Sequence, residues 1–171
     1  LAWNKSPKYG FVYDQVVGFG ELVSTTIISH YMEQQEVHNN WLDVRNLIKT
    51  DNFYRRANVD WDLTQHNIQE QVNQKELNIT QGFLGSDANN FTTTLGREGS
   101  DYTAAIFAYC LNAESVTIWK DVVGVLNADP RYFENAQLLN KISYTEAIEL
   151  AFYGASVIHP KTLQPLQRKE I

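Results

Sequence analysis

Residues 92–105, TTTLGREGSDYTAA, constrain the fold of this chain most strongly. The β-branched threonines at 92–94 favour a strand, and Ser100 or Asp101 suits the N-cap of a helix predicted over 102–111. Gly96 and Gly99 lie between them, and the N-terminus of such a helix favours a phosphate or carboxylate. Arg97 adds a side chain that binds anions through two parallel hydrogen bonds. An ordinary capped turn between a strand and a helix explains the same residues equally well.

Further helical and strand patterns alternate along the rest of the 171-residue chain. Apolar spacing and capping residues predict helices over 21–35, 62–76 and 144–153, and a turn or helix from His159-Pro160. Strands are predicted over 77–83, 116–119 and 157–158, with a strand and turn over 41–48. Because no repeat or linker interrupts this alternation, we expect a single layered α/β domain with a largely parallel sheet.

Composition excludes several classes of protein. The net charge of −6 disfavours nucleic-acid and anionic-membrane partners, which need clustered lysine and arginine. Cys110 is the single cysteine, and the four histidines show no ligand spacing, so neither a disulfide nor a zinc site is expected. No apolar run approaches the roughly 20 residues of a membrane span. We therefore expect a cytoplasmic protein, and the first residue, Leu1, suggests that the chain is part of a longer one.

A second candidate site lies in residues 119–131, WKDVVGVLNADPR. Lys120 and Asp121 follow a predicted strand, and ligands of open α/β sheets bind at the carboxyl ends of strands. The competing interpretation is a solvated Lys–Asp pair before a β-turn at 129–131, and the residues alone favour it. Glu21 stands in the first turn of a predicted helix, where a carboxylate usually serves to stabilise the helix. His159, before a proline, is more typical of a structural histidine.

Five segments together resemble the kinase domain of the aspartate kinases, which belong to the amino-acid kinase family. The segments occur in the family's order and are GELVSTT (20–26), ITQGFLGS (79–86), TTTLGREGSDYTAA (92–105), WKDVVGVLNADPR (119–131) and SYTEAIELAFYGASVIHP (143–160). The resemblance implies a three-layer α/β fold of the carbamate-kinase type, with a mainly parallel sheet between helices. It also implies transfer of the ATP γ-phosphoryl group to the β-carboxylate of L-aspartate, the first step toward lysine, threonine and methionine.

The resemblance assigns a substrate site to the first three segments. Glu21 would face the ammonium group of aspartate, Arg97 would pair with a substrate carboxylate, and Phe83 would form part of the pocket wall. Ser100 and Asp101 would lie at the reacting end as the catalytic residues. The full substrate-binding set implied is Glu21, Phe83, Arg97, Glu98, Gly99, Ser100 and Asp101.

The resemblance places the nucleotide on the last two segments, with ATP and Mg²⁺ as cofactors and no metal ion held by the protein itself. Lys120 and Asp121 would contact the nucleotide, and Arg131 would reach its phosphates. Leu126 stands where many members have an aromatic residue, and Ser156 stands where many have a lysine. The implied nucleotide-binding set is Lys120, Asp121, Leu126, Arg131 and Ser156.

Several departures from the family pattern keep alternatives open. The family's opening strand with its lysine and glycine loop, and its C-terminal ACT domains, do not occur in this sequence, and Glu98 replaces a frequent glycine. We therefore expect residues 1–171 to form a partial catalytic domain that is inactive alone and belongs to a homo-oligomer in the full-length protein. The alternatives are another amino-acid kinase, or a non-catalytic regulatory or assembly subunit with the same fold.

Overall fold

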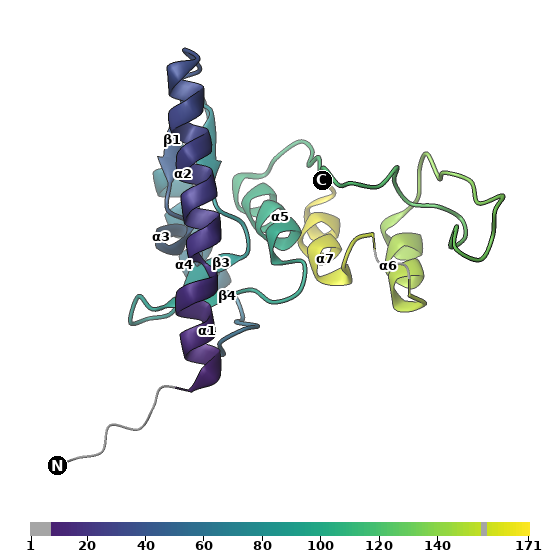
Figure 1. Ribbon diagram of the computed structural model, residues 1–171, viewed down its shortest axis with the longest axis horizontal. Helices are drawn as coiled ribbons and strands as arrows, with labels where there is room; N and C mark the ends of the chain where they lie inside the picture. The colour runs from purple at the N-terminus through teal and green to yellow at the C-terminus, as the bar shows by residue number, and fades with distance from the viewer. Residues whose placement is uncertain (1–7, 155–156) are drawn as a thin grey trace. The chain divides into compact units, whose positions relative to one another are not determined.

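The computed structural model describes residues 8–154 and 157–171 (Figure 1). The chain divides into an N-terminal unit, Leu1–Thr103, and a C-terminal unit, Ala104–Ile171. Helix α5 (Gly99–Leu111) begins in the first unit and ends in the second. Within the part of the chain that the structure describes, every helix is too short or too polar to cross a lipid bilayer.

Two helices joined at Gly18 open the N-terminal unit. α1 (Tyr9–Val17) and α2 (Phe19–Gln34) follow one another in a nearly continuous rod (Figure 1). The helix expected from residue 21 therefore begins two residues earlier, and Glu21 lies in its first turn. A carboxylate at this position is stabilised by the positive end of the helix dipole.

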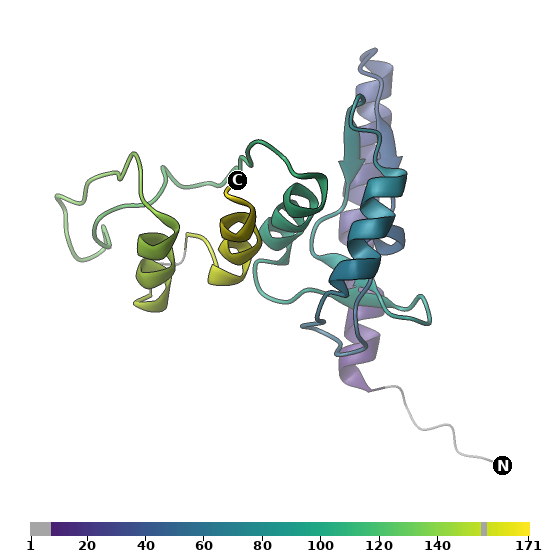
Figure 2. The ribbon, with the colours of Figure 1, turned by 180° about the vertical axis from the view of Figure 1, so that it is seen from behind.

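Short strands lie between helical layers in this unit. β1 (Asn40–Leu42) pairs in parallel with β2 (Asn78–Thr80), and β3 (Leu84–Ser86) pairs antiparallel with β4 (Thr92–Thr94). Figure 2 shows α4 (Trp61–Gln71) in front of the strands and α1 and α2 behind them. The layered α/β arrangement is thus confirmed here, although these strands form two separate pairs, of which only one is parallel.

The strand and turn predicted over 41–48 are confirmed, and the turn is a short helix. β1 ends at Leu42, and Val44 begins the one-turn helix α3 (Val44–Leu47). The Asp43 carboxylate accepts a hydrogen bond from the Arg45 amide at 3.0 Å, which satisfies a donor that a helix start would otherwise leave unpaired. Val44 and Leu47 of this helix are fully buried. They belong to the apolar core of the unit, which also includes Ile48, Ala57, Ile68, Leu84 and Leu95.

The C-terminal unit is helical where capping residues predict helices. α6 (Tyr144–Phe152) begins with the expected capping box: the Glu146 amide donates to Ser143 Oγ at 3.2 Å, and the Ser143 amide donates to the Glu146 carboxylate at 2.7 Å. α7 (Pro160–Lys169) begins at the predicted proline, and His159 Nδ1 accepts the Lys161 amide at 3.1 Å. His159 is therefore a capping residue, as a structural histidine would be.

The predictions of strands at 116–119 and 157–158 are wrong. Neither segment enters a ladder among the described residues, and a short β-prone run is a strand only where a neighbour supplies hydrogen bonds. The backbone pairing of this unit lies elsewhere. Leu126 forms an antiparallel bridge with Leu138, flanked by a hydrogen bond from the Leu139 amide to the Val125 carbonyl at 2.9 Å.

Candidate functional site

The turn after β4 leads directly into α5. The Gly99 amide donates to the Gly96 carbonyl at 3.1 Å, and the Tyr102 amide donates to the Glu98 carbonyl at 3.2 Å. Because this backbone turn already satisfies the helix start, α5 begins at Gly99 and not after a side-chain cap. The expectation that Ser100 or Asp101 is the N-cap is therefore wrong. Both residues lie in the first turn of the helix instead.

Two residues of this turn adopt left-handed backbone conformations. Gly96 has φ +84°, which glycine adopts without strain, whereas Glu98 has φ +52°. A non-glycine residue in this region is disfavoured by about 1 kcal/mol, which explains why glycine suits position 98. The Glu98 side chain is half-buried, and its Oε2 atom finds no hydrogen-bond partner among the described residues. Glu98 therefore strains the loop that it belongs to.

Glycines allow residues 82–83 to pack against the start of α5. A Cβ on Gly82 would lie 2.8 Å from Ser100 Cβ, and a Cβ on Gly99 would lie 2.7 Å from Phe83 Cδ2. The Phe83 amide also donates to Thr103 Oγ1 at 3.0 Å. These contacts bring the TQGF and GREGSD segments together, although they are more than ten residues apart in sequence. Of the predicted site residues, Phe83, Gly99 and Ser100 thus lie in one place.

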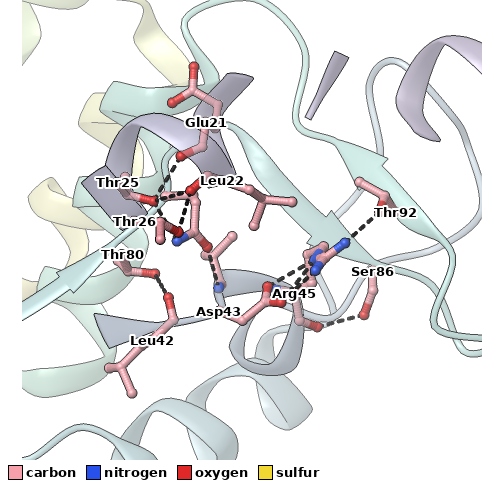
Figure 3. Close-up of polar contacts among 12 residues, drawn as sticks. Glu21, Leu22, Thr25, Thr26, Leu42, Asp43, Arg45, Thr80, Ser86 and Thr92 are labelled. Atoms are coloured by element: carbon pink, nitrogen blue, oxygen red, sulfur yellow. Dashed lines mark hydrogen bonds and ion pairs between the residues drawn. The ribbon is translucent and has the colours of Figure 1, made fainter. Parts of the chain in front are cut away.

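Glu21 is connected to the same region through its own helix turn. Thr25 Oγ1 donates to the Glu21 carbonyl at 2.8 Å (Figure 3). The same hydroxyl accepts a hydrogen bond from Gln81 Nε2 at 2.9 Å. Residue 81 directly precedes the Gly82–Phe83 contact just described, so the first turn of α2 is bonded to the segment that carries Phe83. Arg97 lies in the adjacent turn with an exposed side chain.

Asp14 is a buried residue of this region that sequence reasoning missed. Its side chain is 0% exposed. It accepts hydrogen bonds from the Arg55 amide at 2.8 Å, the Thr94 amide at 2.9 Å and Thr94 Oγ1 at 3.0 Å. It thereby fixes the end of β4, three residues before Arg97. A carboxylate within the apolar YGFVYDQVV helix was the available signal, because a charge in an apolar run indicates a buried partner.

A second polar group attaches α3 to β3 and β4. The Arg45 guanidinium binds the Asp43 carboxylate, with Nη2 2.6 Å from Oδ2, and reaches Thr92 Oγ1 at 3.4 Å (Figure 3). Burial alone would raise the pKa of Asp43, but the hydrogen bonds from Arg45 outweigh it and hold that pKa below its usual value. The Ser86 hydroxyl donates to the Arg45 carbonyl at 2.7 Å. These contacts support the strands behind the candidate site.

The described residues of the predicted nucleotide set lie in the C-terminal unit, on loops. Lys120 and Asp121 are exposed, and Leu126 is half-buried in the bridge with Leu138. The Arg131 guanidinium is exposed and binds Asp129 within the same turn, at 2.7 Å between Nη2 and Oδ2. Ser156 lies outside the described residues. An apolar pocket of about 280 Å³ adjoins this segment, and its lining includes Val125, Ile142, Tyr144, Leu150 and Leu163.

Cys110 takes no part in this candidate site. Its side chain is fully buried, as its apolar sequence neighbours predict. Burial raises the pKa of the Cys110 thiol to about 11. The thiol is therefore protonated near neutral pH and is a poor nucleophile, which agrees with a packing role.

A comparison of the sequence with known protein families shows which family the chain belongs to. Residues 3–171 match the amino acid kinase family. The chain belongs to this family. The α/β fold predicted from the motifs is the amino acid kinase fold, and the solved structures that resemble this chain have it too.

Aspartokinases are prominent among the similar members of the amino acid kinase family. Lysine-sensitive aspartokinase 3 of Escherichia coli is 41% identical over 162 residues, which are 92% of this chain and 36% of that protein. The structure of E. coli aspartokinase III in complex with aspartate and ADP matches with a TM-score of 0.88 and 40% identity, covering 94% of this chain and 36% of that one. Clostridium acetobutylicum aspartate kinase matches with a TM-score of 0.74 and 30% identity, over 90% of this chain and 32% of its own. This chain spans about a third of these relatives.

Proposed function

We propose that this chain is the aspartate-binding and nucleotide-binding part of an aspartate kinase, which transfers the ATP γ-phosphoryl group to the β-carboxylate of L-aspartate. One observation carries the proposal. The segment of Phe83 packs on Gly99 and Ser100 and is hydrogen-bonded, through Gln81 and Thr25, to the turn of Glu21. Three separate motifs of the aspartate kinases thus meet in one unit. The relative solved with aspartate and ADP supports the same substrates.

Each substrate-site residue has a role that follows from its charge and position. The Glu21 carboxylate binds the ammonium group of aspartate, and the Arg97 guanidinium binds a carboxylate through charge-assisted hydrogen bonds. Ser100 and Asp101 lie in the first turn of the 13-residue helix α5. The positive end of the helix dipole stabilises negative charge there. Phosphoryl transfer depends mainly on such positioning and charge stabilisation, not on covalent catalysis by the protein.

We assign the nucleotide to the C-terminal unit. Lys120, Asp121 and Leu126 would contact ATP, together with Ser156, and Arg131 would bind its phosphates after exchanging its Asp129 partner. The described residues hold no cluster of three or more side chains suited to a metal ion. We expect Mg²⁺ to be carried by the nucleotide phosphates, as is common for this ion. Bound there, Mg²⁺ would neutralise phosphate charge.

We also propose the setting in which this domain works. The protein that carries it would be a cytoplasmic homo-oligomer in lysine, threonine and methionine biosynthesis. The name of the lysine-sensitive E. coli relative supports the pathway, and the net charge of −6 with a single cysteine suits a reducing compartment. The feedback domains of the family would lie outside these 171 residues.

An activity assay on the full-length protein that carries this domain tests the proposed function. ADP formation from Mg²⁺–ATP is measured with L-aspartate, L-glutamate or carbamate as the acceptor, and hydroxylamine traps the acyl phosphate product. We expect turnover with L-aspartate only. Turnover with glutamate or carbamate would favour another amino acid kinase. No turnover with any acceptor, in a protein that still binds L-aspartate, would favour a non-catalytic subunit.

A further inference from the structure

We infer that Thr25 and Gln81 are positioning residues of the aspartate site. Their side chains form a hydrogen-bond relay that holds the turn of Glu21 against the segment of Phe83. This inference rests on the proposed function, since it concerns the same site. It adds two residues that contact neither reacting group and that the family motifs leave without a role.

The relay runs in one direction from α3 to α2. The Val44 amide, the first of α3, donates to Gln81 Oε1 at 2.9 Å. Gln81 Nε2 donates to Thr25 Oγ1 at 2.9 Å, and Thr25 Oγ1 donates to the Glu21 carbonyl at 2.8 Å. The dashed line between Thr25 and Glu21 in Figure 3 marks this last bond. The relay therefore joins two helices and the loop before Phe83.

The partners leave the relay little freedom to rearrange. A threonine hydroxyl has one proton to donate and two lone pairs. Thr25 Oγ1 accepts from Gln81 and also from Trp41 Nε1 at 3.2 Å, which uses both lone pairs. Its proton is shared between the Glu21 carbonyl at 2.8 Å and the more distant Leu22 carbonyl at 3.2 Å. Gln81 is 0% exposed, and turning its amide round would place a donor against the Val44 amide. A buried group left without its partner is strongly disfavoured, so this arrangement is enforced.

The relay connects two residues assigned to substrate, Glu21 and Phe83. The last acceptor of the relay is the backbone carbonyl of Glu21, and its inner member Gln81 lies two positions before Phe83. Binding groups must be held within roughly 0.5 Å of the productive geometry by their supporting contacts. Loss of the relay should therefore weaken aspartate binding. It should leave ATP binding unchanged, because the nucleotide residues lie in residues 120–156.

Two threonines of α2 supply a matched test. Thr25→Val removes the relay hydroxyl with almost no change in shape, whereas Thr25→Ser keeps it. Thr26→Val is the control: Thr26 Oγ1 donates to the Leu22 carbonyl at 2.7 Å, the same kind of bond in the same helix, but it does not contact Gln81. Gln81→Glu is a second relay variant, which keeps the acceptor and removes the donor.

The measurement is calorimetric titration of L-aspartate, and separately of ATP, into the full-length protein and each variant. We expect Thr25→Val and Gln81→Glu to weaken aspartate binding about three- to tenfold. Thr25→Ser and Thr26→Val should bind like the wild type, and ATP affinity should be constant throughout. Thermal unfolding followed by circular dichroism identifies any variant that fails to fold. If Thr25→Val or Gln81→Glu does not fold, the other relay variant tests the positioning role.

The possible results separate the inference from the proposed function. If the wild type binds L-aspartate and the folded relay variants bind it equally well, the positioning role is wrong and the proposed function stands. Equal losses in Thr25→Val and Thr26→Val would also overturn the relay, because they would reflect general damage to α2. If the wild type does not bind L-aspartate, the proposed function fails and the relay has no aspartate site to position.

Discussion

The two units of this chain hold their candidate site residues by different means. In the N-terminal unit, buried polar side chains connect distant parts of the sequence, as where Asp14 binds Thr94, 80 positions away. In the C-terminal unit, Arg131 binds Asp129, two positions away. The difference indicates that tertiary structure fixes the proposed aspartate residues, whereas local turns fix the proposed nucleotide residues.

The way in which binding residues are held in place affects how tightly they bind a ligand. A site whose groups are already held in place loses little conformational entropy when a ligand binds. A loop held only by local turns must give up freedom, or exchange a partner, when its ligand arrives. We therefore expect substitutions behind the aspartate site to change both stability and binding, and substitutions on the nucleotide loops to change binding alone.

The largest expected effect is the loss of the buried carboxylate in α1. Asp14→Ala leaves three donors without an acceptor, two on Thr94 and one on Arg55. At about 1–3 kcal/mol for each buried donor, we expect the free energy of unfolding to fall by about 3 kcal/mol or more. Urea unfolding measures it. Asp62→Ala, an exposed carboxylate in the first turn of α4, is the control and should change it by less than about 0.5 kcal/mol. Equal effects would show that the buried hydrogen bonds of Asp14 do not hold the end of β4 in place.

An intermediate effect is expected at the strained turn before α5. Glu98→Gly relieves a left-handed conformation and removes a carboxylate oxygen buried without a partner. We expect the protein to be more stable by about 1 kcal/mol. Glu98→Ala removes the carboxylate but keeps the strain, so it should gain less. Thermal unfolding of the pair separates the two contributions, and a loss of stability in Glu98→Gly would show that the turn does not strain this residue.

The smallest effect on stability is expected in the C-terminal unit. Arg131 and Asp129 form an exposed pair within one turn, and such pairs contribute little to folding. Arg131→Ala should therefore leave the unfolding midpoint unchanged while it weakens ATP binding, measured by titration of the full-length protein. Asp129→Ala releases the guanidinium and should strengthen ATP binding or leave it constant. A clear fall in the unfolding midpoint of Arg131→Ala would show that tertiary contacts hold this loop too.

Local signals in the sequence predicted the fold well. The capping box at Ser143, the helix start at Pro160 and the strand at 92–94 all follow from residues close in sequence, and the structure has each of them. The strands expected at 116–119 and 157–158 failed because strand formation needs a partner that no local pattern supplies. The prediction of an N-cap at Ser100 or Asp101 was wrong because a backbone hydrogen bond from Gly99 to Gly96 forms the turn that starts the helix.

The candidate site was less predictable than the fold. Motif resemblance named Glu21, Phe83 and Arg97, which carry the charges and the ring that a substrate would meet. It did not name Asp14 or Gln81, because their partners lie 80 and 56 positions away and only the folded chain brings them together. Residues that hold a site in place bind other parts of the protein, so their pattern in sequence is weak.

The central claim is that the N-terminal unit presents Arg97 to a substrate carboxylate. Steady-state kinetics of Arg97→Ala in the full-length protein test it most directly, with Asp62→Ala, an exposed charged residue of α4 outside the site, as the control. We expect Arg97→Ala to raise the KM for aspartate about ten- to a hundredfold, as the loss of a charge-assisted hydrogen bond predicts, with the KM for ATP unchanged. Arg97→Lys should recover part of the loss. A change in the KM for ATP alone, or equal damage from Asp62→Ala, would contradict the claim.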